Sequence, residues 1–149
     1  MLNIIKILLF KELKLELRSK ETLLSMLILG IVLTFLFSFS TKQNSTENFI
    51  IFFWVIIFLI SSLGLYRSYQ NEKRMDSFSI LLSSPIDPSL IYVAKSVSFF
   101  IIITLVECIL VPVMLLFFKI SLENYFLLIV LVLTTNWYLA AIGNLIGGM

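Results

Sequence analysis

Residues 22–41 read TLLSMLILGIVLTFLFSFST and contain no charged side chain. A helix of this length extends about 30 Å, which is the thickness of the hydrocarbon core of a bilayer. In lipid such a run has to be helical, because the open edge of a sheet would leave backbone N–H and C=O groups without partners. This stretch therefore predicts a membrane-spanning helix and decides the class of the fold.

Three further apolar runs follow along the chain. Residues 48–66 are uncharged, residues 96–118 are interrupted only by Glu107, and residues 124–149 are uncharged. Asp87 followed by Pro88 is typical of a helix start, since a capping side chain precedes a proline at the first helical position. We expect glycines at 143, 147 and 148 to loosen the end of the last helix. The predicted spans cover about residues 22–41, 48–66, 89–118 and 125–143.

Composition supports the same class of protein. Hydrophobic residues make up 60% of the chain and charged residues 13%, whereas soluble domains are nearer 45–50% apolar and about 25% charged. A soluble core of this size could not bury so much apolar side chain, so the excess has to face lipid. We predict an all-α integral membrane protein with one domain, residues 1–149, built from an N-terminal interfacial amphipathic helix and about four transmembrane helices.

The distribution of basic residues predicts the orientation. Of the 11 Lys and Arg residues, only Lys42 and Lys119 lie in the two short loops. The others lie in the N-terminal segment and in residues 67–95. Because basic residues concentrate on the cytoplasmic side, we expect the N-terminus and the 67–95 segment in the cytoplasm of a multi-pass inner (plasma) membrane protein.

The segment before the first span, about residues 3–20, has an amphipathic pattern. A helical wheel places Leu2, Ile5, Leu9, Leu13 and Leu17 on one face, and Lys11, Lys14 and Arg18 on another. Such a helix lies in the headgroup plane with its basic face toward anionic lipid. The alternative is an ordinary positively charged flank of the first span.

The segment 67–88 is the only sizeable stretch between spans. Its apolar residues Met75, Phe78, Leu81 and Leu82 recur at helical spacing, and Pro85 should end that helix near Ser83. An isolated helix this short is marginal in water, so it needs the membrane or another protein as a partner surface. The alternative is an ordinary loop that rests on lipid.

The inventory of catalytic residues is nearly empty. The chain has no histidine and one cysteine, Cys108, which excludes Ser-His and Cys-His relays and the common metal-ligand sets. It also lacks a glycine-rich phosphate-binding loop, and its net charge of +2 does not indicate a nucleic-acid partner. We therefore predict no enzyme activity, no directly bound cofactor and no bound metal. If ATP drives this protein, another chain must hydrolyse it.

Two residues inside the third span are candidates for an intramembrane role. A charge at the bilayer centre costs at least about 2.5–3.5 kcal/mol, so Glu107 should face the bundle interior or a cavity. It could line a transport path, or be a protonated carboxyl that hydrogen-bonds to a neighbouring helix for packing. Pro112 should kink the span.

The whole pattern resembles the permease subunits of type-2 ABC exporters, and more narrowly the CcmB family of haem exporter proteins in cytochrome c-type biogenesis. The resemblance rests on residues 11–21, 54–65 and 80–87, on Arg67, Glu72, Lys95, Glu107 and Pro112, and on residues 140–143. Family members usually have six spans, so the resemblance implies a chain that is truncated at its C-terminus. Residues 76–79 depart from the glycine and acidic residue common in the family at this turn.

The resemblance implies a mechanism and partners. A CcmA-like ATPase subunit would dock on the segment 67–88 and hydrolyse ATP, with haem as a candidate cargo. Other implied partners are CcmC-like and CcmE-like haem-handling proteins, membrane lipid and a second copy in a homodimer. The implied coupling residues are Arg67, Glu72, Asp76, Phe78, Leu81, Leu82, Pro85 and Asp87. The alternatives are a type-2 ABC permease for a lipid, polysaccharide or drug, and an inactive truncated permease.

Overall fold

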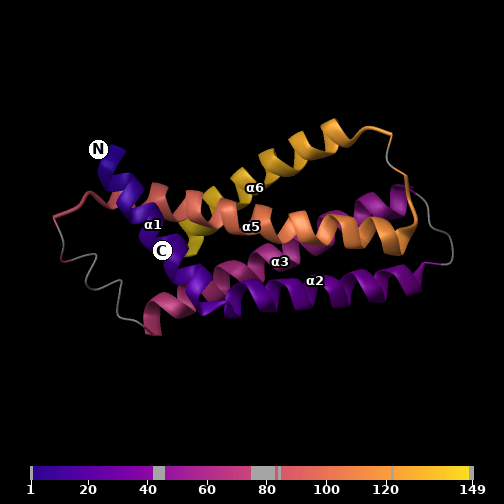
Figure 1. Cartoon of the computed structure of the whole chain (residues 1–149), viewed down its shortest axis with the longest axis horizontal. Helices are drawn as coiled ribbons and strands as arrows, with labels where there is room; N and C mark the ends of the chain where they lie inside the picture. The colour runs from indigo at the N-terminus through magenta and orange to yellow at the C-terminus, as the bar shows by residue number, and fades with distance from the viewer. Residues whose placement is uncertain (1, 42–45, 75–82, 84, 122, 148–149) are drawn as a thin grey trace.

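The computed structural model describes residues 2–41, 46–74, 83, 85–121 and 123–147, and these residues form five helices and no strand. Four long helices run side by side and a shorter one crosses one end of the bundle (Figure 1). The helices are α1 (Leu2–Ser19), α2 (Glu21–Ser40), α3 (Thr46–Arg74), α5 (Pro88–Phe118) and α6 (Tyr125–Gly147). All but α1 are long and apolar enough to cross a membrane. The predicted all-α membrane fold is confirmed.

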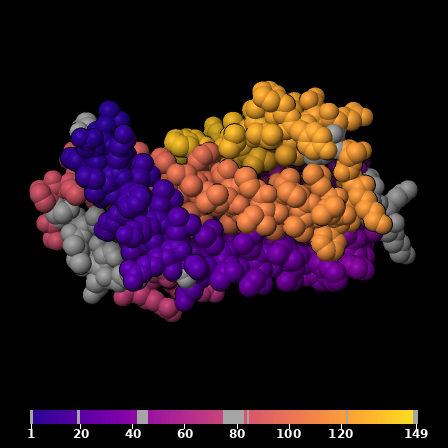
Figure 2. Space-filling model, viewed as in Figure 1, coloured from indigo at the N-terminus to yellow at the C-terminus, as the bar shows by residue number. Residues whose placement is uncertain are grey.

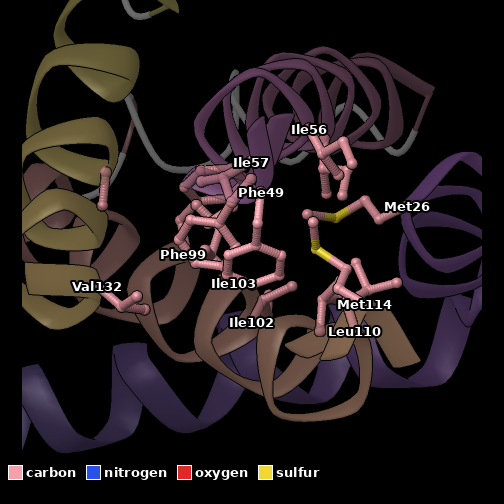
Figure 3. Packing of buried hydrophobic residues seen from close by; sticks show 14 of the residues in the cluster. Met26, Phe49, Ile56, Ile57, Phe99, Ile102, Ile103, Leu110, Met114 and Val132 are labelled. Atoms are coloured by element: carbon pink, nitrogen blue, oxygen red, sulfur yellow. The ribbon is translucent and has the colours of Figure 1, made fainter. Parts of the chain in front are cut away.

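The core lies between α2, α3 and α5. Figure 3 shows its side chains, among them Met26 from α2, Phe49 and Ile56 from α3, and Ile102 and Met114 from α5. These side chains are almost fully buried. Large apolar residues also cover the outside of the bundle, where Leu116 and Phe126 are 76% and 77% exposed. Apolar residues on both sides are expected for helices that pack in lipid, because close fit and not water exclusion holds them together.

The helix α3 is longer than the span predicted for it, whereas α5 covers the predicted residues 89–118 and Pro88. With 29 and 31 residues, α3 and α5 extend roughly 44 and 46 Å, well beyond a hydrocarbon core of about 30 Å. The last turns of α3 contain residues 67–74, which we predicted as the start of a loop. Lys73 and Arg74 lie in the last turn of α3, where positive charge is favoured by the helix dipole. Asp76, Phe78, Leu81 and Leu82 lie outside the described residues.

The start of α5 is where the sequence placed it, and the end of α6 is not. Asp87 precedes Pro88 at the start of α5, and the Leu90 amide donates to the Asp87 carbonyl at 3.0 Å, although the Asp87 side chain makes no capping bond. The helix α6 continues past Gly143 to Gly147. A Cβ at either glycine would overlap a side chain of α3, Leu65 or Tyr69 respectively. These glycines therefore bring two helices close together, and Gly143 does not end α6.

The helix α1 lies across one end of the bundle, which we call the α1 end (Figure 2). It joins α2 at Lys20, whose φ of 49° lies in the left-handed region and turns the chain between the two helices. Figure 1 shows that the end of α3, the start of α5 and the end of α6 lie at this same end. The α1 end therefore gathers parts of the chain that are distant in sequence.

Candidate functional site

A polar cluster joins the helices at the α1 end. Its centre is an ion pair between Lys95 of α5 and Glu72 of α3, whose side chains are only 11% and 14% exposed. The Lys95 Nζ also lies 3.6 Å from the centroid of the Tyr69 ring, an arrangement in which the ring face attracts the cation. Burial makes this pair sensitive to the loss of either partner, because the remaining charge would have no compensation.

Two tyrosines extend the cluster to α6. The Tyr69 hydroxyl donates to the backbone carbonyl of Asn144 at 2.9 Å and lies 3.1 Å from its Oδ1. The Tyr92 hydroxyl, from the first turns of α5, donates to the Ala141 carbonyl at 2.7 Å. Carbonyl groups of α6 thus accept hydrogen bonds from both α3 and α5, and the close approach at Gly147 allows the Tyr69 contact.

The helix α1 contributes two carboxyl groups to the same cluster. The Ser68 hydroxyl of α3 donates to the buried Glu16 carboxylate. Burial raises the pKa of the Glu12 carboxyl, the Glu72 carboxylate raises it further, and Lys95 opposes this shift. Glu72, Lys95, Lys11 and Glu16 all act on the Glu12 carboxyl, so three carboxyl groups and two ammonium groups lie in this region.

The predicted apolar face of α1 is only partly the face that packs. Leu9 and Leu13 pack against the bundle, but Leu2 and Leu17 are exposed, and the buried residues of the helix are Leu8 and Glu16. Lys11, Lys14 and Arg18 are exposed, as predicted for the basic face. The wheel assigned no role to Glu12 and Glu16, because their contacts depend on partners from α3 and α5, which local periodicity does not contain.

The structure describes four of the eight predicted coupling residues. Glu72 lies in the polar cluster, Arg67 is partly exposed on α3, and Pro85 and Asp87 are exposed just before α5. Sequence reasoning did not identify the inward contacts of Glu12, Glu16, Ser68, Tyr69 and Asn144. The only signal was the i, i+4 spacing of Glu12 and Glu16, which places both carboxyls on one helix face. Lys95 was treated as a flanking charge.

A second polar contact lies inside the bundle. Glu107 of α5 is 5% exposed, and Asn136 of α6 donates from Nδ2 to its carboxyl. Glu107 thus faces the bundle interior. A role of Glu107 in packing and a role in a transport path both stay predictions.

Pro112 is exposed on α5, which continues past it to Phe118. Because proline has no N–H, the Cys108 carbonyl lacks its usual helical donor.

The described residues contain no group of three or more His, Cys, Asp or Glu side chains that could hold a metal ion. The chemistry at the α1 end consists of one ion pair, carboxyl groups and hydrogen bonds between helices. Such a cluster can hold helices in one arrangement and respond to a displacement of any of them.

Four helices long and apolar enough to cross a membrane, with a polar cluster at one end, define a multi-pass membrane protein. The CcmB protein family matches residues 3–148, nearly the whole chain. The chain belongs to the CcmB family, and it is therefore a permease subunit of the haem-exporter type in cytochrome c biogenesis. Neither the curated proteins nor the solved structures contained a match.

Proposed function

We propose that the chain couples ATP hydrolysis in a separate CcmA-like ATPase subunit to haem transport or to release of a haem-loaded CcmE-like chaperone. The ATPase docks on the segment between α3 and α5, which faces the cytoplasm of the inner membrane together with the N-terminus. The chain works as a homodimer with a CcmC-like protein nearby. The lack of histidine fits a subunit that moves without ligating haem iron.

The observation that supports this proposal is the position of the Lys95–Glu72 ion pair. Glu72 lies at the end of α3 and Lys95 near the start of α5, so the pair ties together both flanks of the docking segment. A force on the segment reaches both helices at once. Packed helices move as rigid bodies between discrete arrangements, so such a force is transmitted along their length.

The remaining contacts of the cluster extend the movement to the rest of the bundle. Tyr69 connects α3 to α6 through Asn144, and Ser68 connects α3 to α1 through Glu16. Asn71 of α3 donates to the Thr22 hydroxyl of α2 at 3.3 Å. Every described helix therefore has a polar contact to α3 or α5 within a few turns of the docking segment.

The test combines ATPase recruitment with cytochrome maturation. Phe78→Asp places a charge on the proposed docking segment, so we expect it to abolish co-purification of the ATPase from native membranes. Haem staining of membrane c-type cytochromes should then be lost in cells in which this variant replaces the wild-type chain. The matched control is Lys119→Asp at the opposite end of the bundle, which should leave both readouts unchanged.

Normal recruitment by Phe78→Asp would overturn the docking proposal. Unchanged haem staining in cells that lack the gene would overturn the role in cytochrome maturation. Loss of staining with normal ATPase recruitment would place the defect after docking. Insertion of each variant into the membrane is checked by its amount in the membrane fraction.

A further inference from the structure

The contact between Glu107 and Asn136 has an unusual hydrogen-bond pattern. The Asn136 Nδ2 donates to Glu107 Oε2 and lies 3.4 Å from the Thr104 hydroxyl oxygen. Both donors of the amide are thereby used. The two remaining oxygens, Glu107 Oε1 and Asn136 Oδ1, are buried and find no hydrogen-bond partner among the described residues. They belong to side chains that are only 5% and 0% exposed.

The protonation state of the carboxyl decides whether this pattern is stable. An ionised carboxylate has only acceptor oxygens, and so does the free end of the asparagine amide. Two buried acceptors would then have no donor, and one of them would belong to a negative charge in an apolar bundle. A protonated carboxyl has one O–H donor. If that donor is on Oε1, it can donate to Asn136 Oδ1, which satisfies both remaining oxygens at once.

We propose that Glu107 binds a proton inside the membrane bundle, and that this proton closes a clasp of two reciprocal hydrogen bonds between α5 and α6. In one bond the amide of Asn136 donates to Glu107 Oε2, and in the other the Glu107 O–H donates to Asn136 Oδ1. Release of the proton leaves a buried negative charge and two opposed acceptors. The clasp then opens and the contact between α5 and α6 weakens.

No charged side chain forms a described ion pair with the Glu107 carboxyl. The carboxyl is buried, and its described hydrogen bond is the one donated by the Asn136 amide. The neighbouring Cys108 is exposed. Among the cations of α3 and α5, Lys73 and Arg74 lie in the last turn of α3 and Lys95 pairs with Glu72 at the α1 end. The proposal depends on these contacts and not on an ATPase partner, so it is tested independently of the proposed function.

Infrared spectroscopy of the purified chain in lipid nanodiscs tests the proton directly. We expect the wild type at neutral pH to show the C=O stretching band of a carboxylic acid. The band should be absent in Glu107→Gln and present in Glu12→Gln, which removes a carboxyl at the α1 end whose pKa is raised by burial. In Asn136→Leu the band should shift, because its hydrogen bonds are lost. A wild-type spectrum without this band, or a band unaffected by Glu107→Gln, would overturn the proposal.

Thermal unfolding at a series of pH values tests the clasp. Glutamine has the shape and the donor–acceptor pattern of a protonated glutamic acid, so Glu107→Gln should match the wild-type melting temperature at neutral pH. The wild type should lose stability as the pH rises through the pKa of the folded state, and Glu107→Gln should not show this loss. Glu107→Ala should melt several degrees lower at every pH. If Glu107→Gln melts at the same temperature as Glu107→Ala at neutral pH, the proposed pair of reciprocal hydrogen bonds does not form.

Discussion

At the scale of single residues, the stability of the α1 end depends on Lys95. Its ammonium group contacts the Glu72 carboxylate and the Tyr69 ring at the same time. Both contacts are mostly buried, so they are screened little by water or salt. The Lys95 charge contributes to stability only while Glu72 is present, since an unpaired buried charge destabilises a protein far more than a buried pair stabilises it.

We predict that Lys95→Met destabilises the chain by about 3–5 kcal/mol, because it leaves Glu72 buried and uncompensated. The double variant Lys95→Met with Glu72→Leu should recover most of this loss. Thermal unfolding in detergent, followed by tryptophan fluorescence, measures both. Lys119→Met at an exposed position is the control and should change stability by at most about 0.5 kcal/mol. Equal losses in the single and double variants would contradict the ion-pair account.

The Glu12 carboxyl makes the docking of α1 depend on pH. Its pKa is raised by burial and by Glu72, so its contribution to stability is complete at pH values below the ordinary carboxyl pKa. That contribution is lost as the pH rises through the raised pKa of the folded state. We predict that Glu12→Gln removes this loss, so its melting temperature should exceed that of the wild type by a margin that grows from acid to neutral pH.

The control for Glu12→Gln is Glu21→Gln, which neutralises an exposed acid in the first turn of α2. Its difference from the wild type should not grow in the same way. A constant difference between Glu12→Gln and the wild type over this pH range would show that Glu12 does not couple to folding.

At the scale of elements, the contact between α3 and α6 depends on small residues. Gly143 and Gly147 leave room for Leu65 and Tyr69, and the hydrogen bond from Tyr69 to Asn144 forms beside them. Close approach through small residues is a common way for membrane helices to associate. A larger side chain here would separate the helices and break a contact of the polar cluster.

We predict that Gly143→Leu destabilises the chain by roughly 1–3 kcal/mol through overpacking and reduces cytochrome haem staining. Thr134→Leu is the matched control, because it adds a similar side chain to the exposed face of the same helix. Unfolding temperature and staining are compared for both. If Gly143→Leu and Thr134→Leu have the same unfolding temperature and the same haem staining, the close contact between α3 and α6 is not needed for stability or function.

At the scale of the whole molecule, the distribution of basic residues predicts which end faces the cytoplasm. The α1 end carries most of the basic residues, among them the exposed Lys14 and Lys73, whereas Lys119 lies at the other end. The positive-inside rule predicts that the α1 end faces the cytoplasm. The docking proposal requires the same orientation.

Cysteine labelling tests this orientation. In a Cys108→Ala background, we predict that a membrane-impermeant maleimide added to intact spheroplasts labels Lys119→Cys but not Lys14→Cys. Permeabilised membranes should allow labelling of both. The reverse pattern would invert the topology and place the segment between α3 and α5 out of reach of a cytoplasmic ATPase.

The sequence by itself determined the number of the spans, their approximate places, and the start of α5 at Pro88. These features depend on local properties: the length of an uncharged run, and the effect of proline on the residues beside it. The membrane class and the family resemblance followed from the same local patterns, and the family match confirms the resemblance.

Only the tertiary structure decided which polar groups meet. Lys95 pairs with Glu72, Ser68 with Glu16, and Tyr69 with Asn144, although 23, 52 and 75 positions separate the partners. No local pattern contains these pairs, because each depends on the rotation and separation of two packed helices. For the same reason the sequence alone placed Glu107 inside a span but could not assign Asn136 as its partner.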